Sequence, residues 1–160
     1  MTIDLFIDRL DVLGKNLPAY VMKIAERESE AVTASIIRRL ETTGTDARGH
    51  KFGGTAIRLD PAGIYSTWHA ETRKDKGRQV DFMDFSFTDQ MLASVQEISA
   101  KTSGDIVEVV TGASGDRNRE VMKGNVDREG ELLEANEEEI AKLENNFRVS
   151  LEEQIKGMLV

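Results

Sequence analysis

The sequence predicts an α+β protein in which two long helices pack on a small antiparallel sheet, with a long glycine-rich loop. Apolar residues recur at helical spacing over residues 18–42 and again over residues 137–160. Between residues 80 and 112, short apolar runs separated by glycine-containing turns are typical of strands. The loop is indicated by six turn-forming residues within 43–63: Gly44, Gly49, Gly53, Gly54, Pro61 and Gly63.

The chain of 160 residues has the length of a single domain, residues 1–160. We expect four parts in order along it. They are the N-terminal helices at 3–42, the loop and basic segment at 43–79, the small sheet at 80–112, and an acidic linker with the C-terminal helix at 113–160.

The N-terminal part is predicted to contain two helices. The first covers residues 3–13, with Thr2 as a candidate N-cap. Gly14 and Pro18 interrupt the pattern, and Pro18 fits the first turn of a second helix, where a missing N–H is harmless. Gly44 ends that second helix, which has a broad apolar stripe.

Shorter elements are predicted in the middle of the chain. Residues 64–76 favour a short helix that stops at Gly77. Residues 80–87 alternate as a half-buried strand does, and 91–101 and 106–111 favour two further strands joined by a turn at 103–105. A bulge or a helical start near Val95 and Ile98 remains open, because these residues do not alternate cleanly.

The C-terminal helix has the clearest signals in the chain. Asn136 and Glu139 have the spacing of a capping box, and the three glutamates of the first turn suit the helix dipole. A narrow apolar stripe then continues to the C-terminus and requires a partner surface, in the core or in an assembly. Its members are Ile140, Leu143, Phe147, Leu151, Ile155 and Met158.

Charge is distributed unevenly around the net value of −8. Residues 47–78 carry seven basic and three acidic side chains, whereas residues 79–160 carry eight basic and eighteen acidic side chains. Opposite poles allow head-to-tail association of copies, although solvated faces explain such runs equally well. The densest basic cluster supplies the candidates for contact with DNA in a lumen or with a neighbouring subunit: Arg73, Lys74, Lys76 and Arg78.

Signals of catalysis or of a cofactor are missing from the sequence. There is no cysteine, and His50 and His69 lack a second histidine at metal-ligand spacing. Gly53 is followed by a glycine and a threonine, but without the lysine of a phosphate loop a turn is expected there. No apolar run reaches the ~20 residues of a membrane span, and no signal peptide is evident. We therefore expect a soluble cytoplasmic protein without catalytic residues, cofactor, metal site or membrane contact.

A metal-dependent nuclease is the enzymatic alternative. Asp81, Asp84 and Asp89 are near one another in sequence and are of the type that holds Mg²⁺. On a strand, however, Asp81 and Asp84 point to opposite faces, which disfavours a shared ion. An acidic outer face beside a phenylalanine core face is the preferred interpretation.

The stretch from Phe85 to Val95 resembles a motif of tailed-bacteriophage neck and tail-completion (virion morphogenesis) proteins. That motif has a Thr-Gly pair, a spacer, Leu or Met, two residues, then Ser and a β-branched residue. Thr88, Met91, Ser94 and Val95 match it, and Asp89 stands where the family prefers glycine. The order of elements over residues 17–158 is also similar to that of the family.

The resemblance implies a structural virion protein at the head–tail junction, in a neck, head-completion or tail-completion ring. It implies a non-enzymatic homo-oligomer without cofactor, twelve copies being favoured over six. The ring would be assembled in the host bacterial cytoplasm and bound to portal-proximal or tail proteins in the virion, with possible non-specific contact with packaged DNA. The alternative from another class is a cytoplasmic nucleic-acid-binding or processing accessory protein that uses the basic patch 73–78.

Overall fold

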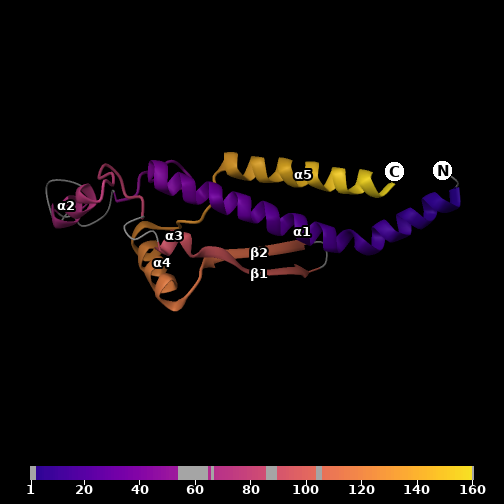
Figure 1. The fold of residues 1–160 in the computed structure, drawn as a ribbon, viewed down its shortest axis with the longest axis horizontal. Helices are drawn as coiled ribbons and strands as arrows, with labels where there is room; N and C mark the ends of the chain where they lie inside the picture. Colours follow the sequence, from indigo (N-terminus) through magenta and orange to yellow (C-terminus); the bar gives the residue numbers. More distant parts are fainter. Residues whose placement is uncertain (1–2, 54–64, 66, 86–89, 104–105, 160) are drawn as a thin grey trace.

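The computed structural model describes residues 3–53, 65, 67–85, 90–103 and 106–159. The protein is mostly helical and has two long helices and one small antiparallel sheet, so the predicted α+β class is confirmed (Figure 1). The elements are α1 (Ile3–Thr43), α2 (Thr67–Asp75), α3 (Gln90–Ala93), β1 (Val95–Ser103), β2 (Ile106–Ala113), α4 (Asp116–Glu129) and α5 (Glu137–Leu159).

Helix α1 is a single helix of 41 residues with Pro18 in its interior, so the predicted break between two helices is wrong. Figure 1 shows α1 bent in the N-terminal half that contains Pro18. A proline inside a helix removes one hydrogen bond and crowds the carbonyl four residues earlier. That carbonyl belongs to Gly14. Because Gly14 and Pro18 are both exposed, water can reach the open carbonyl, and the proline accounts for a bend in this half of the helix.

The C-terminus of α1 lies at Gly44, as predicted. The amide of Gly44 donates to the carbonyl of Leu40 at 3.1 Å, and Gly44 has φ 61°. A Cβ at this position would lie 2.5 Å from Cδ2 of Phe82 and 2.6 Å from the carbonyl oxygen of Met83. Glycine is therefore required both for the left-handed backbone and for the close approach of residues 82–83.

Helix α1 is the central element, because α5 runs antiparallel along one side of it and the β1–β2 hairpin packs on another (Figure 1). The two strands pair antiparallel from Val95 opposite Ala113 to Ser103 opposite Ile106. The register shifts between Glu97 and Ser99, so of the two alternatives left open near Ile98 the structure has the bulge.

The hydrophobic core lies where the C-terminal half of α1 meets the loop after it, α3, α4 and the segment before α5. Its buried members are Ile36, Leu40, Phe52, Met91, Leu92 and Leu132. This core occupies only one end of α1 (Figure 1), so the remainder of that helix is covered by α5 and the hairpin alone.

Three predictions for the middle of the chain are corrected. No strand forms over residues 80–85, because the Gln79 side chain accepts hydrogen bonds from the amides of Asp81 and Phe82 and holds them in a turn.

The strand predicted from Met91 begins at Val95, after the four-residue helix α3. The linker predicted before residue 136 contains α4, whose polar sequence buries only part of Met122 and Val126. The rest of the predicted 80–87 strand and the motif residues Thr88 and Asp89 lie outside the described residues.

Candidate functional site

The basic segment is built around Arg73, which is buried although its sequence context predicts a surface contact. Only 1% of Arg73 is exposed. Its guanidinium donates to Oδ2 of Asp84 at 2.5 Å through Nη2 and to the Gln79 carbonyl at 2.8 Å through Nε. The same guanidinium lies 4.7 Å from the ring centroid of Tyr65. The structure therefore places Arg73 inside the segment, held by Asp84, Gln79 and Tyr65, rather than on the surface with the other three basic candidates.

Gln79 and Tyr65 complete a small polar core around this ion pair. Nε2 of Gln79 donates to Oδ2 of Asp84 at 2.7 Å and to the Phe82 carbonyl at 2.9 Å. The Tyr65 hydroxyl donates to the same carbonyl at 3.0 Å. A buried ion pair is tolerated when such hydrogen bonds satisfy its remaining groups. This polar network, rather than an apolar one, fixes the segment between α2 and Phe85.

The remaining cationic side chains lie on the outside of this segment. Lys74 and Lys76 are exposed, and Arg78 is half-buried. Trp68 on α2 is 71% exposed, beside His69 at a ring-centroid distance of 6.4 Å. Figure 1 shows α2 at the far end of the molecule from the chain termini. The segment thus presents an aromatic ring and basic groups at one end of the molecule.

Two ionisable groups on this segment have shifted pKa values. Partial burial, and secondly the positive charge of Arg73, lowers the pKa of His69 below its ordinary value of 6.5. Burial, and secondly the negative charge of Asp84, raises the pKa of Tyr65. Both residues are therefore mainly neutral at pH 7.

The acidic groups considered for a nuclease do not form a metal site in the described part of the chain. Asp84 is buried against Arg73 and Gln79, whereas Asp81 is exposed. Among the described residues no group of three His, Cys, Asp or Glu side chains is placed to hold a metal ion. Asp89 lies outside the described residues.

The start of the glycine-rich loop is an ordered turn. The Asp46 carboxylate accepts hydrogen bonds from the amides of Arg48 and His50, at 2.9 and 2.8 Å. Partial burial acts to raise the pKa of Asp46, but these hydrogen bonds and that from the His50 ring lower it below its ordinary value. The amide of Gly53 donates to Oε2 of Glu129 at 2.8 Å. The Gly53 amide is therefore already bonded to an acidic side chain, and the following glycine and threonine lie outside the described residues.

The predicted assembly face of α5 is directed mainly at α1. Leu143, Phe147, Leu151 and Ile155 are half-buried, and α5 packs along α1 (Figure 1). Ile140, at the start of the stripe, is 45% exposed. The predicted capping box is present, with the Asn136 amide donating to Glu139 Oε2 at 2.9 Å and the Glu139 amide donating to Asn136 Oδ1 at 2.8 Å. Within this chain the stripe thus serves mainly as a core face.

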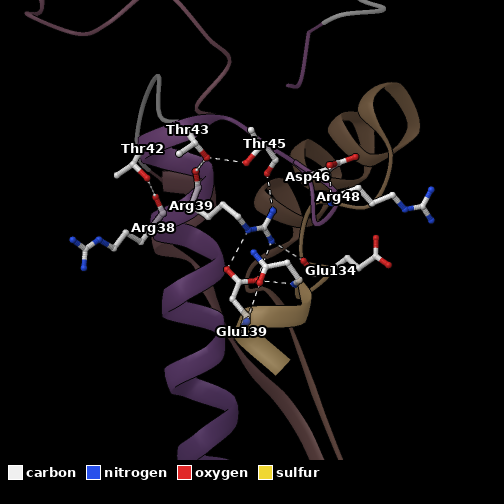
Figure 2. A network of polar contacts seen from close by, with 10 residues as sticks. Arg38, Arg39, Thr42, Thr43, Thr45, Asp46, Arg48, Glu134 and Glu139 are labelled. Carbon is white, nitrogen blue, oxygen red and sulfur yellow. Dashed lines mark hydrogen bonds and ion pairs between the residues drawn. The ribbon is translucent and has the colours of Figure 1, made fainter. Parts of the chain in front are cut away.

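Arg39 is an important residue that the sequence pattern does not reveal (Figure 2). It extends from α1 to the Glu139 carboxylate, with Nε 3.1 Å from Oε1 and Nη2 3.3 Å from Oε2. It also donates to the carbonyls of Thr45 and Glu134, each at 2.7 Å. One guanidinium therefore joins the end of α1, the following loop, the segment before α5 and the capping box of α5. An arginine beside the apolar stripe of α1 is the one signal of this role in the sequence.

The described residues of the stretch 85–95 have a structural role. Met91 is 5% exposed and belongs to the core. The Ser94 hydroxyl donates to the Met91 carbonyl at 2.7 Å and so ends α3, and the Ser94 carbonyl accepts from the Ser114 amide at 2.9 Å. These residues therefore connect α3 to the hairpin.

No protein-family model, curated protein or solved structure matches this chain. Among the helices of the described residues, none is both long and apolar enough to cross a membrane.

Proposed function

We propose that this chain is a structural, non-enzymatic subunit of a homo-oligomeric ring at the head–tail junction of a tailed bacteriophage. The observation that carries the proposal is the amount of surface that one copy exposes. The chain has an accessible surface of 10669 Å². A compact monomer of 17.8 kDa is expected to expose about 8,000 Å². Surface in such excess is typical of a subunit that buries part of it against other copies.

The placement of exposed apolar side chains supports the same proposal. Large hydrophobic residues are exposed on α1, on the hairpin and on α5. Exposed apolar groups on several elements favour contacts with more than one neighbour, as in a ring. The resemblance of residues 85–95 to neck and tail-completion proteins supplies the position in the virion and the expectation of twelve copies rather than six.

The test is the mass of the purified protein by native mass spectrometry and its shape by electron microscopy. We expect a closed ring that coexists with few free subunits at micromolar concentration. We also expect the protein in purified particles of the phage that encodes it, beside portal and tail proteins. A monomer or dimer at all concentrations, together with absence from the particles, would contradict the proposal.

A nucleic-acid-binding accessory protein remains the second candidate, because Trp68 on α2 and the nearby basic residues Lys74 and Lys76 of the same segment are all exposed. Aromatic rings stack on bases, and lysines neutralise phosphates. This candidate predicts that single-stranded DNA quenches the fluorescence of Trp68, the only tryptophan, and that binding weakens steeply with salt. Charge reversal of Lys74 and Lys76 would then remove binding. In the ring the same variant would change DNA retention if the patch faces a lumen, and assembly if it faces a neighbour.

A further inference from the structure

The N-terminal segment of α1, residues 3–13, is unusually apolar for the end of a helix. Its side chains at Ile3, Ile7 and Leu10 are 78%, 56% and 43% exposed, and their spacing places them on one face. Seven of its eleven residues are apolar: Ile3, Leu5, Phe6, Ile7, Leu10, Val12 and Leu13. The other four residues are charged, so the segment is amphipathic, and the apolar face of such a helix normally packs on another surface.

The rest of the chain covers little of this segment. Nη1 of Arg9 donates to the carbonyl of Leu159 at 3.0 Å, so α5 ends beside Arg9. Figure 1 shows α1 continuing beyond both α5 and the tip of the hairpin. A helix end of about eleven residues is marginally stable by itself in water. Gly14 and Pro18 follow it and weaken its continuity with the remainder of α1.

A second exposed apolar surface lies on the hairpin. One face of the hairpin packs on α1, and the opposite face carries Ile98, Val110 and Ile106. These side chains are 56%, 38% and 69% exposed, respectively. Ile98 bends over Gly112, where its Cδ1 is 2.8 Å from the position that a Cβ would take. Glycine here leaves room for the isoleucine side chain over the strand. Between Val110 and Ile106 the same face carries the exposed ion pair of Lys101 and Glu108.

We propose that the N-terminal segment of α1 docks across the outer face of the β1–β2 hairpin of a second copy of this chain. The proposal rests on the proposed ring function and names the contact that joins its subunits. A segment of eleven residues is about 16 Å long, and strands of eight to nine residues extend about 26–30 Å. The helix therefore fits within the length of the sheet.

Three observations favour a second copy as the partner. The two apolar surfaces occur on the same chain, and the segment lies beyond the hairpin tip along the long axis, where it cannot reach its own hairpin face (Figure 1). A contact between two different surfaces of one chain is heterologous, and such contacts generate rings. The accessible surface of 10669 Å² exceeds the about 8,000 Å² of a compact monomer of this mass, which leaves surface for contacts with two neighbours. A standard interface needs about 800 Å² per partner.

Cysteine cross-linking tests the contact directly, because the wild-type chain contains no cysteine. We expect the Leu10→Cys/Val110→Cys protein to form a ladder of cross-linked oligomers with a short bis-maleimide. Leu10→Cys alone and Val110→Cys alone should give none. The matched control Leu10→Cys/Lys142→Cys, with Lys142 exposed on α5, should also give no ladder. Cross-linked dimers from Leu10→Cys alone would mean that two segments pair with each other, and would overturn the proposal.

Assembly of a docking-face variant separates this inference from the ring function. We expect the circular-dichroism spectrum of Ile7→Asp/Leu10→Asp to match that of the wild-type chain, because both side chains are exposed in one copy. The protein concentration needed for ring formation should rise at least tenfold. The control Asp8→Asn/Asp11→Asn changes exposed polar groups of the same segment and should assemble normally. Rings formed equally well by Ile7→Asp/Leu10→Asp would overturn the inference and leave the ring function intact. A wild-type chain that never assembles would overturn both.

Discussion

At the scale of single residues, the fold depends on a few positions with exact steric or polar requirements. Gly44 and Arg39 both lie near the end of α1, and each connects that end to a different part of the chain. Gly44 allows residues 82–83 to approach, and Arg39 holds the beginning of α5. Substitutions here should therefore disturb tertiary contacts rather than the helix itself.

Replacement of Gly44 by alanine should destabilise the protein by about 2–4 kcal/mol, because it adds left-handed strain and a clash with Phe82. Gly49→Ala is the matched control, since Gly49 has φ 83° but no atom lies within 4 Å of the position that its Cβ would take. It should cost only about 1–2 kcal/mol from the backbone. Urea unfolding followed by circular dichroism measures both, and equal losses would show that the Phe82 contact contributes nothing.

Replacement of Arg39 by methionine should cost about 3–5 kcal/mol, because it leaves the buried Glu139 carboxylate without its cation. The carbonyls of Thr45 and Glu134 also lose their donor. Arg148→Met removes an exposed ion pair with Glu152 and should change the free energy of unfolding by at most about 1 kcal/mol. Thermal unfolding compares the two variants, and similar melting temperatures would contradict this account of Arg39.

At the scale of elements, periodicity and capping predict some parts of the fold and not others. The C-terminal helix is predicted within one residue, because the capping box and a one-sided stripe agree. Helix α4 escapes prediction because its side chains are mostly polar and none of its residues is buried. The role of Arg73 escapes it too, since only tertiary contacts distinguish a buried arginine from its exposed neighbours Lys74 and Lys76.

The α2 segment should loosen in mild acid. The pKa of His69 is lower in the folded segment than its ordinary value of 6.5, because of burial and the charge of Arg73. The unfolded segment therefore binds the proton more readily, so the stabilisation is complete above pH 6.5 and declines as the pH falls below that value. Trp68 fluorescence should follow this change with a midpoint below 6.5. His69→Gln should remove the transition, and a midpoint at or above 6.5 would contradict the prediction.

At the scale of the whole molecule, the chain is elongated, because α1 alone is about 61 Å long for its 41 residues. A compact protein of this length would have a radius of gyration of about 15 Å. We expect small-angle X-ray scattering of the monomeric Ile7→Asp/Leu10→Asp variant to give a clearly larger value. A radius near about 15 Å would mean that α5, the hairpin and α1 fold into a more compact arrangement.

The packing of α1 against α5 also has a consequence for synthesis on the ribosome. Helix α1 is complete at Thr43, but its partner is complete only at Leu159. At elongation rates of about 5–20 residues per second, α1 waits roughly 6–23 s for α5. During that interval its apolar face is open to other nascent chains and to chaperones. Folding is therefore expected to finish only after α5 has been synthesised, and chains that stop before α5 should be the ones that aggregate or are degraded.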